Sequence, residues 1–312
     1  MSLVDFIITC ASKLYWRQQT GSGSLIWSSI ASSSDGAKLA ACGYDNSTST
    51  GYIYTSTDTG DTWTPRGSSK AWYAVASSSD GVRLVAIANS TDYIYTSSDS
   101  GVTWVAQTGS ANTTWGAIAS SSNGSKLVAA RTAGRIYTST DYGVSWTSRT
   151  GAPSTYWNSV ASSSDGTKLA ACGYDSSNMY ASSDSGATWA THNAPATCAF
   201  FLLTSSSDGT KLAAVAYNFN TSRHDRVITS TDSGVSWAIT ATFTEALYSI
   251  TCSADGATVV LGGTDYVYVS QDSGSTFVQT SLPGTKWYVA CSSDGIKKAA
   301  APLDPNYICI YK

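Results

Sequence analysis

Charged side chains are scarce in this chain of 312 residues. They make up 12% of it, and 18 basic residues against 21 acidic residues leave a net charge of −3. Nucleic acids and anionic membrane surfaces bind proteins through concentrated positive charge, so neither is expected as a partner. The hydrophobic runs are all shorter than a membrane-spanning helix, so membrane insertion is not expected either.

Residues that usually carry catalysis or bind metals are also few. Glu245 is the only glutamate, and the two histidines, His192 and His224, lie in different repeats. Glycoside hydrolysis needs a pair of carboxyl groups, and most aspartates here occupy repeated turn positions. A protein metal site needs several clustered ligands. The sequence therefore predicts a non-enzymatic protein with no metal and no cofactor.

The cysteines do not suggest a disulfide framework. There are seven, an odd number, and Cys42 and Cys172 occupy equivalent repeat positions among small apolar residues. This pattern is typical of buried cysteines that act as small hydrophobic residues. The first ten residues contain Asp5 and no basic residue, unlike a signal peptide. We therefore expect a soluble and intracellular protein, while its compartment stays open.

What the chain does have is a motif repeated six times. Ser-x-Asp-x-Gly-x-Thr/Ser-Trp/Phe, called the box below, starts at Ser56, Ser97, Ser139, Ser182, Ser230 and Ser270. Its aspartates are Asp58, Asp99, Asp141, Asp184, Asp232 and Asp272. Each carboxylate is placed to accept backbone N–H groups of its own turn, and the glycine lets the chain reverse. These aspartates are predicted to be structural.

A second marker sets the number of repeats. The sequence Ser-Ser-Asp-Gly, or a close variant, has its turn residue at Asp35, Asp80, Asn123, Asp165, Asp208, Asp255 and Asp294. The intervals are 45, 43, 42, 43, 47 and 39 residues, which is the period of a four-stranded propeller blade. The sequence predicts an all-β fold, a single seven-bladed β-propeller over residues 1–312 with four-stranded antiparallel blades. The expected blades are about 21–67, 68–109, 110–151, 152–194, 195–241, 242–281, and 282–312 together with 1–20.

The two chain ends are predicted to close the ring. The seventh repeat stops after its third strand, Tyr307–Tyr311, while the run Thr9–Trp16 matches a box in length and in its final tryptophan. We expect Leu14–Gln19 to pair with Tyr307–Tyr311 as the fourth strand of the last blade, which leaves no open sheet edge. The register of Leu3–Thr9 stays open.

The box resembles the Asp box of bacterial neuraminidase repeats, which occurs in sialidases, sortilin-type receptors, some glucanases and the photosystem II assembly factor. The resemblance covers essentially the whole chain and implies a propeller whose boxes lie at the periphery, away from any ligand. Sialidase activity does not carry over, because the chain lacks the Arg-Ile-Pro signature and has few arginines. The resemblance thus implies a non-catalytic, lectin-like member.

Candidate ligand-binding residues are expected on the face opposite the boxes. Tryptophans begin the innermost strand of five repeats, at Trp27, Trp72, Trp115, Trp157 and Trp287. Two loops share the sequence Gly-Tyr-Asp and add the candidates Tyr44, Asp45, Tyr174 and Asp175. One repeat position is polar in several repeats, and its residues Gln19, Arg66, Gln107 and Arg149 are further candidates. Indole faces stack on sugars, and arginine and glutamine donate several hydrogen bonds. Alternatively, the indoles pack between blades as spacers and the polar residues are solvated strand ends.

Three functions follow from these patterns. The first is recognition of glycans at repeated, tryptophan-lined sites, where repetition would add avidity. The alternative is a protein-interaction scaffold or assembly factor, which would carry one asymmetric patch. The only such break visible in the sequence is the longer loop Asn218–Arg226, expected to be solvated. A glycoside hydrolase is the third possibility and the least supported.

Overall fold

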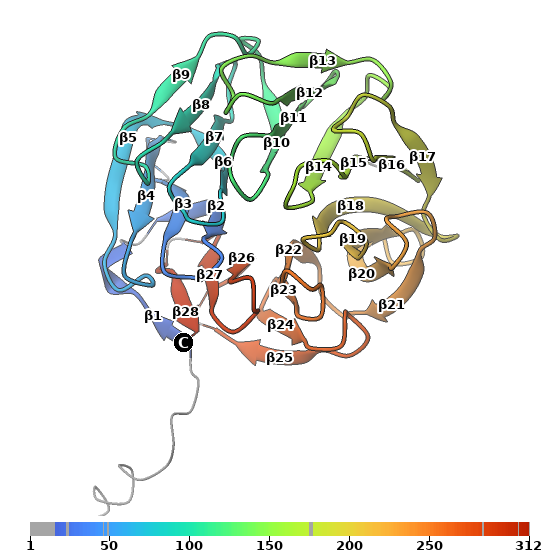
Figure 1. Ribbon diagram of the computed structural model, residues 1–312. Coiled ribbons are helices and arrows are strands. Elements are labelled where there is room, and N and C mark those ends of the chain that lie inside the picture. Colours follow the sequence, from blue (N-terminus) through green and yellow to red (C-terminus); the bar gives the residue numbers. More distant parts are fainter. Residues whose placement is uncertain are drawn as a thin grey trace, which may run out of the picture.

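In the computed structural model, seven antiparallel sheets of four strands surround a central channel (Figure 1). The structure describes residues 16–22, 25–45, 47–48, 50–174, 177–282, 284–304 and 306–311. The predicted seven-bladed propeller is confirmed. The interpretations of Thr9–Trp16 as a degenerate box and of the register of Leu3–Thr9 concern a segment outside the described residues, except for Trp16 itself.

Each blade runs from an innermost strand at the channel to an outermost strand at the rim. Blades 1 to 4 consist of β2 (Ile26–Ser32), β3 (Leu39–Tyr44), β4 (Gly51–Ser56) and β5 (Thr64–Lys70); β6 (Trp72–Ser77), β7 (Leu84–Ala88), β8 (Ile94–Ser97) and β9 (Val105–Gln107); β10 (Trp115–Ser120), β11 (Leu127–Arg131), β12 (Ile136–Ser139) and β13 (Thr147–Arg149); β14 (Trp157–Ser162), β15 (Leu169–Gly173), β16 (Asn178–Ser182) and β17 (Ala190–Asn193).

The remaining blades follow the same order, and a short 3-10 helix, η1 (Thr20–Ser22), follows β1. Blades 5 to 7 consist of β18 (Cys198–Ser205), β19 (Leu212–Asn218), β20 (Arg223–Ser230) and β21 (Ala238–Thr242); β22 (Leu247–Cys252), β23 (Val259–Gly263), β24 (Tyr266–Ser270) and β25 (Val278–Ser281); β26 (Trp287–Cys291), β27 (Lys298–Pro302), β28 (Cys309–Tyr311) and β1 (Trp16–Gln18). Strand β5 runs three residues past the expected end of blade 1 at residue 67.

The hydrophobic core lies between the blades. The second strand of each blade is a run of small apolar residues, and β7, for example, is buried along its whole length. Such runs suit strands that are covered on both faces. In the described residues the buried side chains form seven clusters, and each cluster joins two adjacent blades. No blade therefore has a core of its own, and each depends on its neighbours.

The last blade is closed by the N-terminal strand, as predicted. In β1 and β28, Trp16 pairs with Tyr311, Arg17 with Ile310 and Gln18 with Cys309. After the strand, the Gln19 N–H donates to the Ile308 carbonyl at 2.8 Å. The Ile308 N–H donates in turn to the Ser22 hydroxyl at 3.1 Å. The two chain ends thus provide the hydrogen bonds that a continuous hairpin provides in the other blades, and β28 keeps no unpaired edge.

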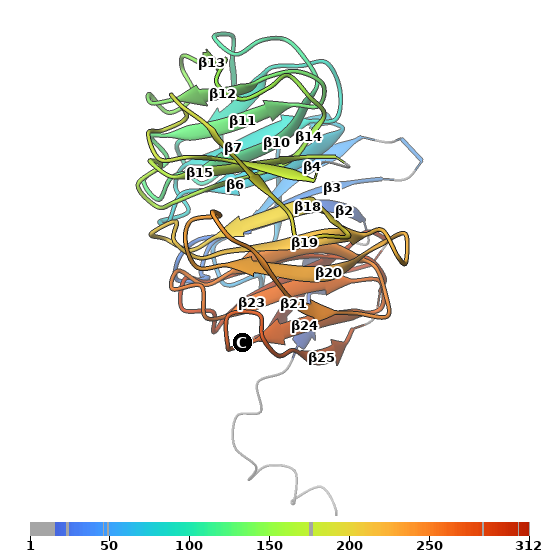
Figure 2. The ribbon, with the colours of Figure 1, turned by 90° about the vertical axis from the view of Figure 1, so that its right-hand side faces the viewer.

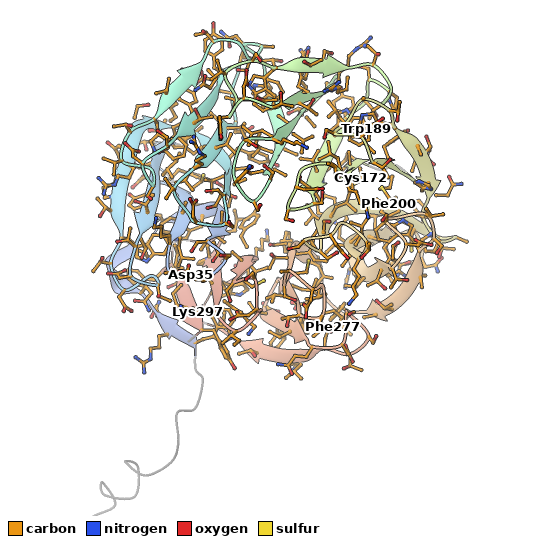
Figure 3. The ribbon with its side chains drawn as sticks, in the orientation of Figure 1. Asp35, Cys172, Trp189, Phe200, Phe277 and Lys297 are labelled. Carbon is orange, nitrogen blue, oxygen red and sulfur yellow. The ribbon has the colours of Figure 1, made fainter. Side chains whose placement is uncertain are left out.

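One face of the ring, called the box face below, carries both kinds of turn. On it, one backbone N–H per blade donates to the carbonyl of the next blade at 2.7 or 2.8 Å, from Ser34, Ser79, Ser122, Ser164, Ser207, Ala254 and finally Ser293 back to Ser34. At the junction of blades 7 and 1, the Lys297 Nζ also donates to the Asp35 carbonyl at 2.8 Å (Figure 3). This closed circle of hydrogen bonds ties all seven blades together. The opposite face, called the loop face, carries the connections between the second and third strands and those between blades (Figure 2).

Candidate functional site

The six boxes on the box face are held by internal hydrogen bonds. In the third box the Ser139 hydroxyl accepts the Gly143 N–H at 2.9 Å and donates to Asp141 at 2.8 Å. Asp141 also accepts the Ser145 N–H at 2.9 Å. Hydrogen bonds from the hydroxyls of Thr188, Ser236 and Thr276, together with the equivalent backbone and serine bonds, hold the pKa of Asp184, Asp232 and Asp272 at about 2. Every box carboxylate is thus engaged with its own turn.

The five candidate tryptophans are buried between blades. Their exposed fractions are 0% for Trp27 and Trp287, 1% for Trp115, 2% for Trp72 and 3% for Trp157. Each lies in a different interblade cluster, and Phe200 and Leu247 fill the two remaining interfaces. Phe200 is labelled in Figure 3. These rings therefore pack between adjacent blades as spacers, which was the alternative interpretation. None of the five presents a face on which a sugar could stack.

Three of the four candidate polar side chains also bond within their own blades. Arg66 and Arg149 donate from Nε to Thr55 and Thr138 at 3.4 and 2.6 Å, and Gln107 donates from Nε2 to Thr96 at 2.5 Å. They lie on outermost strands, whereas the tryptophans lie on innermost strands. Gln19 lies beyond β1 and is half-buried. The expected site of tryptophans with polar neighbours is therefore not assembled.

The two Gly-Tyr-Asp loops differ from each other. In the first, Tyr44 ends β3, and Asp45 accepts the Ser47 N–H at 2.7 Å within its own turn. A hydrogen bond from the Ser47 hydroxyl, followed by this bond from the Ser47 N–H, lowers the pKa of Asp45. In the second loop, Tyr174 is 55% exposed, while Asp175 lies outside the described residues. Only Tyr174 of this group projects a large apolar surface into solvent.

The mouth of the channel on the loop face is lined by residues that the sequence analysis missed. In six blades the pairing of the innermost strand shifts by one residue directly after its first large buried side chain. Such a bulge turns one side chain away from the regular alternation. The six bulge residues are Ser28, Tyr73, Gly116, Asn158, Phe201 and Tyr248, and Tyr288 holds the corresponding place in blade 7. All but Phe201 line the channel, which has a volume of about 250 Å³.

Tyrosines dominate one side of this mouth. Burial raises the pKa of Tyr288 to about 12, and the neighbouring Tyr73, Tyr44 and Tyr248 act in the same direction. Tyr73 is 39% exposed, so it combines a channel position with contact to solvent. The phenols of Tyr288 and Tyr73, whose pKa values burial raises, keep their protons at neutral pH and can both donate and accept hydrogen bonds.

Aromatic rings continue from Phe201 outward across blade 5. Phe201 stacks on His224 with ring centroids 3.7 Å apart, and Tyr217 packs edge-on against His224 at 5.2 Å. Phe219 follows at 5.8 Å from Tyr217, and Tyr174 of blade 4 lies 6.3 Å from Phe201. We call these five residues the aromatic strip. Its two ends are open to solvent, because Tyr174 is 55% and Phe219 is 50% exposed.

The strip exists because blade 5 is longer than the others on the loop face. Its first three strands contain eight, seven and eight residues, whereas β11 contains five. The prediction that Asn218–Arg226 is a solvated loop is wrong in part. Arg223–Arg226 begins β20, and Asp225 is only 2% exposed. The interval of 47 residues between turn markers was the sequence signal for this extension.

The fold defines the class of the protein as a seven-bladed β-propeller. No protein-family model and no curated protein sequence matches the chain, so membership of the Asp-box repeat family remains a prediction.

Solved structures match it over nearly its full length. YCF48 bound to D1 peptide is 14% identical and has a TM-score of 0.70, over 97% of this chain and 96% of that one. YCF48 from Cyanidioschyzon merolae is 15% identical with a TM-score of 0.71, over 95% and 98% of the two chains. The GH74 enzyme of Niastella koreensis is 17% identical with a TM-score of 0.65, over 93% of this chain but only 43% of that enzyme. At such identities the likeness shows the fold alone.

Membrane-spanning helices and metal-binding clusters are both absent from the described residues. None of the helices there is long and apolar enough to cross a membrane. Histidine, cysteine, aspartate and glutamate side chains do not gather there into a group of three or more that could hold a metal ion. The six cysteines in the described part are free, and Cys42 and Cys172 are fully buried, as their apolar neighbours predict.

Proposed function

We propose that this protein is a non-catalytic binding protein that recognises a segment of a protein partner on its loop face, through the aromatic strip. The observation that carries the proposal is the break in symmetry. Five of the seven interfaces repeat a buried inner-strand tryptophan, and among the described residues only blades 4 and 5 join five rings into one continuous row. An asymmetric patch is what an interaction scaffold requires.

The chemistry of the strip suits a peptide. Tyrosine and phenylalanine are enriched in the centres of protein interfaces, where they provide large contact areas with few rotatable bonds. Stacking of Phe201 on His224 holds the middle of the strip in place before any partner arrives. Such preorganisation lowers the entropy lost on binding.

Two further observations favour a protein over a glycan as the ligand. Burial of the five tryptophans removes the repeated stacking surfaces on which the glycan hypothesis rested. One of the solved structures with this fold, YCF48, is described as bound to a peptide. That likeness supports the proposal through the fold only, since the two chains share 14% of their residues.

The experiment is a selection of peptides from a displayed random library on the immobilised full chain. Peptides selected on the wild type should bind the double variant Tyr174→Ala, Phe219→Ala at least tenfold more weakly. A matched control removes exposed apolar surface from the box face, where Val144 and Val235 are 61% and 63% exposed. The variant Val144→Ser, Val235→Ser should bind as the wild type does.

Two results would overturn the proposal. One is selected peptides that bind both double variants equally well. The other is a library that yields no binder while a glycan array yields a ligand that the Tyr174→Ala, Phe219→Ala variant loses.

A further inference from the structure

A lysine occupies a core position in blade 7. The second strand of each blade starts with a buried residue, which is Leu39, Leu84, Leu127, Leu169, Leu212 or Val259 in blades 1 to 6 and Lys298 in blade 7. The side chain of Lys298 is as buried as these, with 6% exposed. Burying a cation in place of an aliphatic core residue is unfavourable for folding, and the other six blades avoid this free-energy cost.

The ammonium group of Lys298 has few polar partners. Its Nζ donates to the Ile296 carbonyl at 3.0 Å and lies 4.5 Å from the centre of the Tyr311 ring. The one ion pair between described residues is Lys70–Asp92, so Lys298 pairs with no described carboxylate. Burial lowers the pKa of Lys298, and the more distant Cys291 and Asp294 oppose that shift. An ammonium can donate three hydrogen bonds, so donors remain available for a ligand.

Lys298 borders open space between two blades, as the equivalent residues Leu127 and Leu212 do. In blades 1 to 5 the box glycine packs closely over the equivalent leucine, and a Cβ on Gly143 would lie 3.1 Å from Leu127. Lys298 lines a pocket of about 390 Å³ between blades 6 and 7, called the seam pocket.

The walls of the seam pocket are apolar and aromatic. Trp16 and Tyr311 have their ring centroids 5.5 Å apart, and Val269 and Val278 line the side that blade 6 contributes. Asp272, the box aspartate of blade 6, lies on the pocket wall and keeps its own turn contacts. The pocket therefore combines a buried cation, two rings and one fixed negative charge.

We propose that the seam pocket binds a small organic monocarboxylate, whose carboxylate pairs with Lys298 and whose apolar body packs against Trp16 and Tyr311. A buried charge is costly alone and is stabilised by an opposite charge in the same low-dielectric site. Aromatic rings supply apolar contact for the body of the ligand. A second negative charge on the ligand would be repelled by Asp272, so the pocket selects a monoanion. This site lies on another part of the ring than the aromatic strip and does not depend on it.

The test compares phenylacetate with its neutral analogue phenylacetamide by calorimetric titration of the full chain. Phenylacetate should bind the wild type, and phenylacetamide should bind at least tenfold more weakly. Lys298→Leu restores the residue of the other repeats and should weaken phenylacetate binding at least tenfold. The binding of phenylacetamide should not change in that variant.

A second variant guards against a folding artefact. Lys298→Met keeps an unbranched side chain without the charge and should behave as Lys298→Leu does. The inference is overturned if the wild type binds no phenylacetate at millimolar concentration, if the amide binds as tightly as the acid, or if both variants retain phenylacetate affinity.

Discussion

The two faces of the ring differ in how closely they repeat. On the box face, seven backbone hydrogen bonds of 2.7 or 2.8 Å link the blades in a circle, and each box is held by the same set of contacts. On the loop face, the side chains at the channel mouth differ in size from blade to blade, from Gly116, which has none, to the large ring of Tyr288. Every blade must meet the same steric demands on the box face, whereas the loop face is free to vary. The repeated face builds the ring, and the variable face is where recognition can be specific.

The largest loss of stability is expected when a buried tryptophan is removed. Trp115→Ala should lower the free energy of unfolding by about 3–5 kcal/mol, because a fully buried ring leaves a cavity between blades 2 and 3. Tyr156→Ala, which removes a ring that is 64% exposed on the loop face, should change it by less than about 0.5 kcal/mol. Denaturant unfolding of both variants checks the difference. Equal losses would mean that the tryptophans are not spacers.

A smaller loss is expected from a single box. Ser139→Ala removes the acceptor of the buried Gly143 N–H and should cost about 1–3 kcal/mol, the penalty for an unsatisfied buried donor. Ser148→Ala, on the exposed strand β13, is the matched control and should be neutral. Thermal unfolding of the two variants would measure this. A neutral Ser139→Ala would contradict the structural role of the box.

A still smaller effect should appear on acidification. The pKa of Asp184, Asp232 and Asp272 is about 2 in the folded chain, below the value of roughly 3.9 for an unfolded aspartate. Stability from these groups is therefore complete above pH 4 and is lost as the pH falls toward 2. Urea unfolding at pH 5, 4, 3 and 2 should show this decline. Asp184→Asn should make it shallower, and an unchanged slope would contradict the assignment.

Much of the box face could be predicted from the sequence, because its turns are local. Eight residues contain the serine and aspartate hydrogen bonds that shape a box, as Ser139 and Asp141 show, and the spacing of Asp35 and Asp80 then counts the blades. Closure by the N-terminal strand followed from the missing fourth strand of the last repeat.

The candidate site could not be predicted in the same way, because exposure depends on neighbours that lie far apart in the chain. Strand alternation places Trp72 beside its interblade neighbours, but only the bulge directs Tyr73 into the channel. The contact of Tyr174 with Phe201 joins two blades, and no local motif marks it. The five tryptophans looked suited to ligand binding, yet the approach of adjacent blades buries them.

The most direct test of the account is hydrogen exchange on the full chain, with and without a peptide selected on it. The account predicts slower exchange in residues 217–224 and at Tyr174, and unchanged exchange in the third box, residues 139–146. Protection of that box, or of the interblade grooves on the box face, without protection of residues 217–224 would contradict it.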